Sequence, residues 1–178
     1  MHPRIKELVE ALDSRHAELT RAVNEVPTVA RNRRPSEDRW SVAEVLEHLA
    51  LVEESVPQRV KALVTEQRTS GLGAERESTS IAETFDSAFM LDRSKKRVAR
   101  EAMQPRSGVD AAAAWTRLER ARQVTHETLR ELDGVALSDV SAPHPVLGAL
   151  NGYQWFLFLA AHEGRHAAQI REIAGAAA

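Results

Sequence analysis

Apolar residues recur every three to four positions in four segments of the 178-residue chain. This spacing is typical of amphipathic helices, in which the apolar side chains share one face. The first segment covers about residues 3–26, and its apolar positions are Ile5, Leu8, Leu12, Leu19 and Val23. Pro3 suits a first turn, where the backbone donor that proline lacks is not needed. The pattern therefore predicts a first helix over residues 3–26.

The second segment has a well-marked start. Ser41 can cap a helix, and Glu44, three residues later, can return a hydrogen bond to the cap, as in a capping box. The apolar face then continues at Val45, Leu49, Val52 and Val56. Pro57 removes a backbone donor and crowds the preceding turn, so we expect a kink or a break at this position.

The third and fourth helices are predicted over residues 110–133 and from residue 151 onward. Gly134 is placed to end the third helix. Asn151 and Gln154 repeat the cap of the second helix, with Leu150 positioned to pack on Trp155. No strand pattern competes with these helices, so we expect an all-α chain that forms one domain over residues 1–178.

The connection between the second and third helices is long, covering about residues 69–108. Helices in compact bundles are usually joined by roughly two to eight residues. A longer connection lets the chain travel along the whole bundle before the next helix begins. We therefore expect a four-helix bundle of up-down-down-up order with a long crossover between helices 2 and 3, so that helices 2 and 4 run antiparallel.

Composition excludes several classes of partner and site. The 24 basic and 26 acidic residues leave a net charge of -2, which gives no general attraction to nucleic acid or to an anionic membrane. The one basic cluster, Arg31, Arg33 and Arg34, fits a solvated loop. The chain has no cysteine, so any metal must be held by nitrogen and oxygen ligands. No segment approaches the roughly 18 apolar residues of a membrane span, and we expect a cytoplasmic protein with no membrane partner.

Three histidines fall on core-facing positions. His162 and His166 are one turn apart on the apolar face of the fourth helix. His48 lies on a face of the second helix that overlaps the apolar face of that helix. A buried imidazole needs hydrogen-bond partners or a metal, because burying a polar group unsatisfied costs about 1–3 kcal/mol. His48 lies seven residues after the Ser41 cap, and antiparallel packing would bring it level with His166. These positions predict a three-histidine metal site.

Other polar residues near these positions leave alternatives open. His16 lies on the core-facing side of the first helix. It could be a further metal ligand or a hydrogen-bonded core residue. Glu44 could face the metal, although its role in capping the second helix is enough to explain a glutamate at this position. Gln169 is placed to hydrogen-bond a ligand imidazole or a bound substrate, or to reach solvent. Glu163 is expected to be exposed. The remaining histidines are weaker candidates and are His2, His126 and His144.

Two stretches resemble the DinB-like (DinB/YfiT) superfamily. They are "WSVAEVLEHLALVEE" and "HPVLGALNGYQWFLFLAAHEGRHAAQI", and the second joins a Pro-x-x-Gly approach, an aromatic residue and H-x3-H-x2-Q-I. The middle of the chain matches loosely through "RVAREAMQP". The resemblance implies a four-helix bundle of up-down-down-up order, often dimeric, with a divalent metal (Zn, Ni or similar) held by His48, His162 and His166.

The resemblance also implies a range of activities. Some members are transferases or isomerases that use bacillithiol, mycothiol or glutathione, and others are metal-dependent hydrolases. We expect a metal-dependent S-transferase or isomerase that uses a low-molecular-weight thiol and a small-molecule substrate, in a homodimer formed by helix faces. The alternatives are a metal-dependent hydrolase and a non-catalytic bundle with structural histidines.

Overall fold

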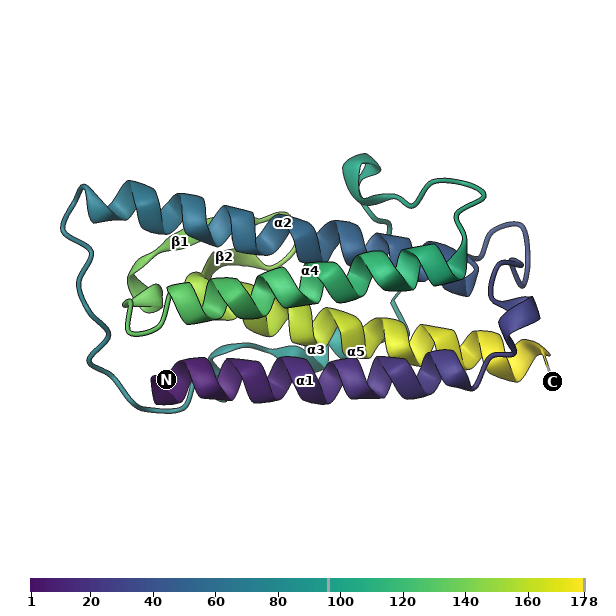
Figure 1. The fold of residues 1–178 in the computed structure, drawn as a ribbon, viewed down its shortest axis with the longest axis horizontal. Coiled ribbons are helices and arrows are strands. Elements are labelled where there is room, and N and C mark those ends of the chain that lie inside the picture. Colours follow the sequence, from purple (N-terminus) through teal and green to yellow (C-terminus); the bar gives the residue numbers. More distant parts are fainter. Residues whose placement is uncertain (96, 178) are drawn as a thin grey trace.

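Four long helices pack side by side in the computed structural model, which describes residues 1–95 and 97–177, with side chains up to residue 175 (Figure 1). They are α1 (Pro3–Asn24), α2 (Val42–Arg68), α4 (Ala111–Glu131) and α5 (Gly152–Ala177). The shorter elements are η1 (Thr28–Ala30), η2 (Ala82–Thr84), α3 (Ser87–Leu91), η3 (Glu101–Met103), η4 (Leu137–Asp139), β1 (Ser141–His144) and β2 (Gly148–Asn151). In the described part of the chain, no helix has the length and apolarity needed to cross a membrane.

The predicted helix starts are confirmed. The Ser41 hydroxyl accepts from the backbone N–H of Glu44 at 3.2 Å, and the Glu44 carboxylate accepts from the backbone N–H of Ser41 at 2.9 Å. Asn151 and Gln154 exchange the equivalent pair of bonds at the start of α5, both at 2.9 Å. Each pair satisfies backbone donors that have no partner inside the helix, which fixes where these two helices begin.

Of the kink or break expected at Pro57, the break is wrong, because α2 continues past it to Arg68. A proline inside a helix costs about 3 kcal/mol. The apolar face of α2 is buried on both sides of it, at Val52, Val56, Val60 and Val64. Burying a valine side chain stabilises the fold by roughly 1.5–3 kcal/mol, so these contacts outweigh the cost of one proline.

The expectation of an all-α chain is also corrected, since β1 and β2 form an antiparallel hairpin. The strands have four residues each and contain Pro143 and Gly148, so no alternating pattern identified them. Gly148 adopts φ +76°, a conformation that glycine tolerates best. The hairpin leads directly into α5 and places His144 against that helix, where its ring lies 4.7 Å from the ring of Phe158.

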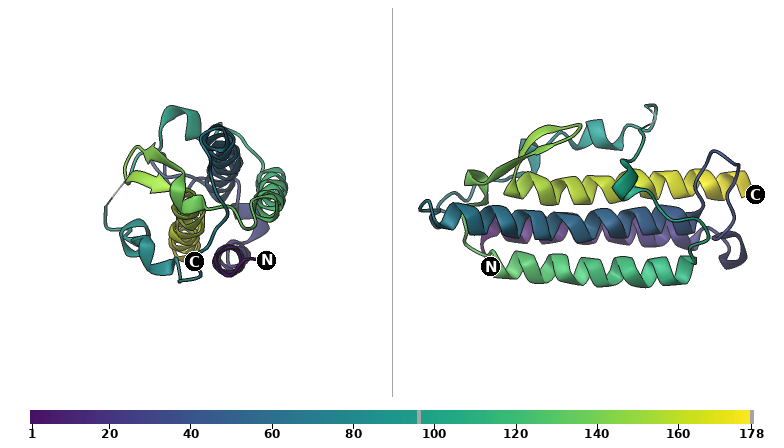
Figure 2. Two further views of the ribbon diagram at one scale, coloured as in Figure 1. Left: turned by 90° about the vertical axis from the view of Figure 1, so that its left-hand side faces the viewer. Right: turned by 90° about the horizontal axis from the view of Figure 1, so that it is seen from above.

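α2 and α5 are antiparallel neighbours. Near one end, Arg39, which precedes α2, lies 3.5 Å from Glu172 near the end of α5. Toward the other end, the Arg59 guanidinium lies 5.1 Å from the ring centre of Trp155, in the first turn of α5. Figure 2 shows the bundle end-on, with the hairpin and the connection between α2 and α4 outside it on the side of α2 and α5. This side of the bundle is where the candidate site lies.

The connection of residues 69–108 is anchored to α5. Arg165, in the middle of α5, is buried and donates to the backbone carbonyls of Met90, Asp92 and Lys95. A single guanidinium can make several such bonds at once because its donors form a rigid fork. The long connection is therefore held over α5 and contributes residues to the cavity described below.

Candidate metal centre and adjoining cavity

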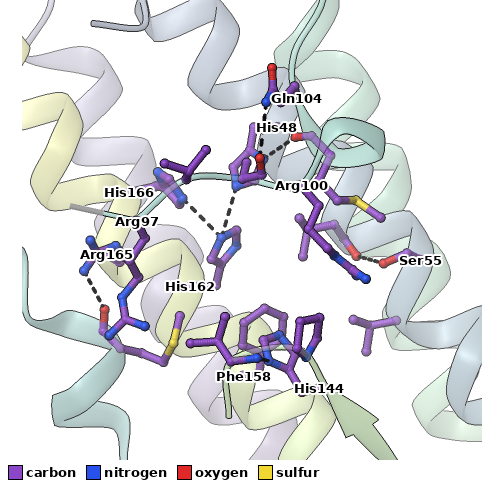
Figure 3. A pocket seen from close by; sticks show the side chains of 18 of the residues that line it. His48, Ser55, Arg97, Arg100, Gln104, His144, Phe158, His162, Arg165 and His166 are labelled. Atoms are coloured by element: carbon purple, nitrogen blue, oxygen red, sulfur yellow. Dashed lines mark hydrogen bonds between the residues drawn. The ribbon is translucent and has the colours of Figure 1, made fainter. Parts of the chain in front are cut away.

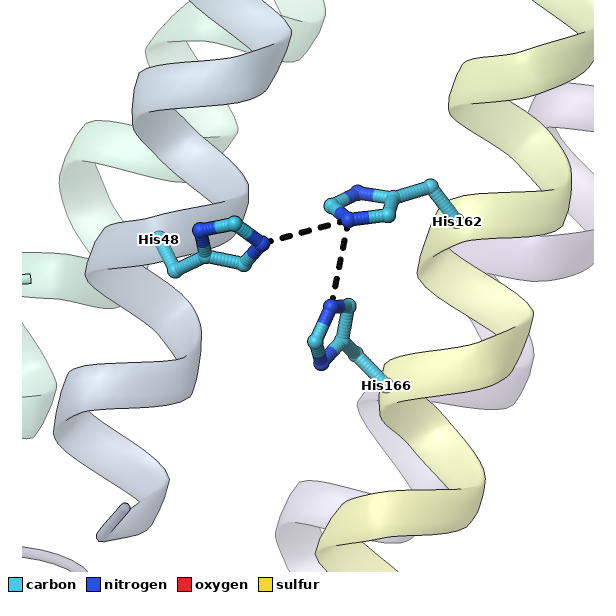
Figure 4. A group of neighbouring side chains, drawn as sticks. All are labelled: His48, His162 and His166. Atoms are coloured by element: carbon cyan, nitrogen blue, oxygen red, sulfur yellow. Dashed lines mark hydrogen bonds between the residues drawn. The ribbon is translucent and has the colours of Figure 1, made fainter. Parts of the chain in front are cut away.

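The three histidines predicted from their positions meet between α2 and α5 (Figure 4). The Nε2 atom of His162 lies 3.2 Å from Nε2 of His48 and 3.2 Å from Nε2 of His166. One ligand atom from each of the three lies within 4.8 Å of the others. All three side chains are buried, with exposed fractions of 5 to 8%. The antiparallel arrangement of the two helices thus brings side chains from both into one cluster.

Hydrogen bonds fix which nitrogen carries the proton in two of these rings. A carbonyl oxygen can only accept, so the contact of 2.6 Å between Nδ1 of His48 and the Met103 carbonyl places the proton on Nδ1. Nδ1 of His166 lies 2.8 Å from Oε1 of Gln169 and donates to it in the same way. The Nε2 atoms of His48 and His166 therefore both present lone pairs toward His162. Of the alternatives left open for Gln169, the hydrogen bond to an imidazole of the cluster is the one that the structure shows.

Neutral imidazoles alone do not satisfy this geometry. Nε2 of His162 carries at most one proton and can donate it to only one of its two neighbours. At least one of the two 3.2 Å contacts then brings a lone pair against a nitrogen that donates no hydrogen to it, and the two electron-rich atoms repel each other. A cation between the three nitrogens would remove that repulsion, and tetrahedral zinc with bonds of about 2.0–2.1 Å separates its nitrogens by roughly 3.3–3.4 Å. The donor set and its spacing fit a divalent metal.

The protonation state of the three histidines also fits a metal site. Burial lowers the pKa of His48 below its usual value. Burial, with the charges that neighbouring histidines would carry, puts the pKa of His162 and of His166 well below the usual range. The rings are therefore neutral near pH 7, which is the form that coordinates a metal.

Glu44 faces away from this cluster. Its carboxylate accepts from the backbone N–H of Ser41 and from the Arg34 guanidinium, whose Nε lies 2.9 Å from Oε2. Burial alone would raise the pKa of Glu44, but the bonds from Arg34 and Ser41 bring it below its usual value. The helix cap and the ion pair account for this residue.

The expectation that Glu163 is exposed is wrong. It is 1% exposed and lies on the side of α5 that faces α1 and α4, where it contacts Arg122 at 2.8 Å and His16 at 2.9 Å. Arg122 also lies 3.1 Å from Glu53 of α2. One residue from each long helix thus joins a buried charge network. A helix packed on several sides buries more than one face, which a single apolar stripe does not predict.

His16 belongs to this network and not to the three-histidine cluster. Its other ring nitrogen lies 2.9 Å from Glu119. Burial would lower the pKa of His16, but the hydrogen bond and charge of Glu163 raise it above the usual value. Burial raises the pKa of Glu53, against the attraction of Arg122. Two carboxylates, one guanidinium and a histidine that favours its charged form therefore balance one another inside the bundle.

A cavity of about 1050 Å³ opens beside the three histidines, all of which line it (Figure 3). Its volume is at the upper end of the roughly 300–1,000 Å³ of small-molecule sites. Aromatic rings line it between the hairpin and the metal centre, since His144 lies 4.7 Å from Phe158, and Phe158 lies 5.2 Å from His162. Arginines from α2, from α5 and from the long connection line the same cavity.

Several of these cavity residues could not be identified from the sequence. His144 was a weak candidate because it lies between two prolines, and only the hairpin shows that it faces α5. Burial, followed by the charges of Arg100 and Arg59, lowers the pKa of His144 to about 4. Arg97 and Arg100 lie in "RVAREAMQP", the stretch that matches the family only loosely. No sequence pattern there assigns a role to either residue.

Comparisons with known proteins agree with this architecture. The family model of the DinB superfamily matches residues 11–170. YuaE of Bacillus subtilis (strain 168), an uncharacterised protein, is 28% identical over 143 residues, which cover 80% of this chain and 82% of YuaE. The crystal structure of TT2238, a four-helix bundle protein, superposes with a TM-score of 0.58 at 19% identity, over 94% of this chain and 98% of TT2238. At that identity the likeness concerns the fold alone.

Proposed function

This chain belongs to the DinB superfamily, and we propose that it is a divalent-metal-dependent enzyme whose ion is held by His48, His162 and His166. One observation supports this proposal above the others: the three histidines form one wall of a large cavity. Structural zinc sites are usually closed by four protein ligands, whereas catalytic sites keep a position open. Within the described residues, the cluster offers three ligands and no fourth.

When bound, a divalent ion such as zinc or nickel would stabilise an exchangeable anionic ligand, a thiolate or a hydroxide, on its open side. The residues of the chain prepare that position. The Met103 carbonyl and the Gln169 amide orient the rings of His48 and His166 so that their Nε2 lone pairs point to the centre. Phe158 stacks on His162 and shields one side of it from water.

We propose a low-molecular-weight thiol as the second reactant, in an S-transferase or isomerase. A thiol must come from outside, because the chain has no cysteine. The cavity has few carboxylates that could take a proton from an activated water. Only Asp38 and Glu66 among its described lining residues are carboxylates. Glu66 lies eighteen residues beyond His48 on α2, about 27 Å at 1.5 Å per residue, too far to take a proton from a water beside the histidines.

We also propose the up-down-down-up order of the bundle. It is supported by Figure 1, in which α1 and α5 run toward one end and α2 and α4 run toward the other. The homodimer and the cytoplasmic location expected from the sequence stay predictions.

Two measurements on protein purified without an affinity tag test the proposed function. Metal analysis should find about one divalent ion per chain, and the metal-loaded protein should consume a small thiol such as glutathione in the presence of an electrophilic acceptor. Replacing any one of His48, His162 or His166 by alanine should abolish both. The matched control is His126→Ala, since His126 lies on α4 and contacts Asp13 at 3.1 Å.

Two outcomes would count against this reading. Turnover retained in a metal-free triple-alanine variant with parental helical content would reject the mechanism. Hydrolysis of an activated ester that needs metal but no thiol would favour the metal-dependent hydrolase.

A further inference from the structure

The cavity beside the three histidines is rich in positive charge. Six arginines line it, and they are Arg39, Arg59, Arg93, Arg97, Arg100 and Arg165. Against them stand only two carboxylates among the described lining residues, Asp38 and Glu66. Low-dielectric walls strengthen the field inside a cleft whose charges have one sign. A ligand of opposite charge would therefore be attracted toward the metal centre.

Three of the six arginines have their charge engaged by the protein. Arg93 and Arg39 lie 2.7 Å and 3.5 Å from the carboxylate of Glu172. Arg165 donates to backbone carbonyls of the long connection. These interactions hold the wall of the cavity together and leave less of their charge for a ligand.

The other three, Arg59, Arg97 and Arg100, form no ion pair with a carboxylate in the described part of the chain. Two of their guanidinium groups lie over aromatic rings, Arg59 over Trp155 at 5.1 Å and Arg97 over Phe89 at 4.1 Å. In Figure 3, Arg97 and Arg100 lie on opposite sides of His162.

Two buried donors on this wall also have no acceptor among the described residues, Nε of Arg97 and Nε1 of Trp155. A buried donor without an acceptor costs about 1–3 kcal/mol, so an unsatisfied donor in a native protein usually has a functional role or a partner such as a ligand. A ligand in the cavity that brings an acceptor to such a donor would remove this cost.

His144 adds a donor at the hairpin end of the cavity. Its Nδ1 accepts from the backbone N–H groups of Val146 and Leu147, both at 3.2 Å. The proton of the neutral ring is therefore on Nε2. The ring lies 5.3 Å from Trp155, on which Arg59 rests. Burial lowers the pKa of His144 to about 4, and the charges of Arg100 and Arg59 contribute to the same shift, so both guanidinium groups act on this ring.

We propose that Arg59, Arg100 and His144 bind the anionic group of a small organic acid, a carboxylate or a phosphate ester, whose apolar part lies along Trp155 and Phe158 toward His162. Phe158 lies 4.7 Å from His144 and 5.2 Å from His162, so one ligand can contact both ends of this row of rings. The inference rests on the proposed function in one respect, in that it assigns the substrate class of the same cavity.

The test is a binding titration on the full-length protein by calorimetry, with three probes of similar size. They are 3-phenylpropionate, phenyl phosphate and the neutral 3-phenylpropanamide. At least one anion should bind about tenfold or more tightly than the amide, since charge-assisted hydrogen bonds are about twice as strong as neutral ones. The affinity should fall as salt is raised. Which anion binds more tightly identifies the carboxylate or the phosphate as the preferred group.

Variants assign the effect to the named residues. Arg59→Gln and Arg100→Gln should each weaken binding of the preferred anion about tenfold, and both side chains are exposed, so the fold should tolerate them. His144→Phe keeps an aromatic ring and removes the donor, and it should also weaken the anion but not the amide. The control, Arg120→Gln, makes the same change of charge on an exposed position of α4 outside the cavity.

Equal affinity for the anions and the amide would overturn the inference, as would cavity variants that bind like Arg120→Gln. The readout is binding and not turnover. A protein without metal or without thiol activity would therefore contradict the proposed function while this experiment still decides the anion site.

Discussion

The Nε2 atoms of His48 and His162 lie 3.2 Å apart across the interface of α2 and α5, although the residues are 114 positions apart in the chain. Neither ring has a carboxylate partner among the described residues. Their closeness and the lone pair directed inward from His48 are what a shared cation would require. Metal removal and substitution of Gln169 distinguish a shared cation from a cluster of structural histidines.

Metal removal should lower the melting temperature of the parent protein. An ion that binds only the folded state adds RT ln(1 + [M]/Kd), about 2.7 kcal/mol at a hundredfold excess over Kd. Calorimetric scans with and without a chelator measure the shift, which should vanish in His166→Ala. Equal shifts in the variant and the parent would mean that the chelator acts elsewhere.

Gln169→Ala should weaken metal affinity by about 10- to 100-fold, the usual scale for a residue that orients a ligand. The amide oxygen accepts from His166, and loss of that bond frees the ring to rotate or change tautomer. Competition with a chromophoric chelator measures the affinity. Gln123→Ala, at an exposed position of α4, serves as the control, and an affinity equal to that of the control would contradict the orienting role.

The free energy of unfolding should fall as the pH drops from about 6.5 toward 4, partly because of His144. Its pKa is lowered from 6.5 to about 4 in the folded protein, so below pH 6.5 the unfolded chain binds a proton that the folded chain does not. Stability is therefore present above the unfolded pKa and is lost as the pH falls through this window. Urea unfolding at several pH values should give a smaller slope for His144→Phe, and an unchanged slope would remove the attribution to this residue.

Arg122→Met should destabilise the fold by about 3–5 kcal/mol, because it removes the cation that two buried carboxylates share and leaves Glu53 with no ion-pair partner among the described residues. Arg122 lies 3.1 Å from Glu53 and 2.8 Å from Glu163, and all three side chains are buried. Urea unfolding compares it with Arg120→Met, on the exposed side of the same helix. A loss below about 1 kcal/mol would show that the two carboxylates are neutral in the folded protein.

The protein should form a homodimer through helix faces, as the family resemblance and the alanines of α1 and α4 led us to expect. Small residues allow helices of two chains to approach closely. Light scattering at micromolar concentration should give twice the monomer mass of 19.7 kDa. A monomer would remove the dimer and leave the metal centre unaffected.

The helices and the three histidines could be predicted because their signals are local. The apolar spacing and the reciprocal caps at Ser41 and Asn151 depend on residues within one or two turns, and the structure has helices starting at those caps. The stripe on the fourth helix likewise included His162 and His166. Local patterns of this kind determine which face of a helix is apolar, and hence which side chains face the core.

The remaining features depend on contacts between distant segments, and only the tertiary structure decided them. Glu163 is buried because α1 and α4 cover a second face of α5, and α2 continues through Pro57 because its flanking valines are buried. His144 faces the cavity because four-residue strands turn it toward Phe158. Arg59, Arg97 and Arg100 line one cavity although they come from α2 and the long connection, which share no sequence pattern. Burial and electrostatic environment are set by which segments pack together, and nearby residues in the sequence do not specify that.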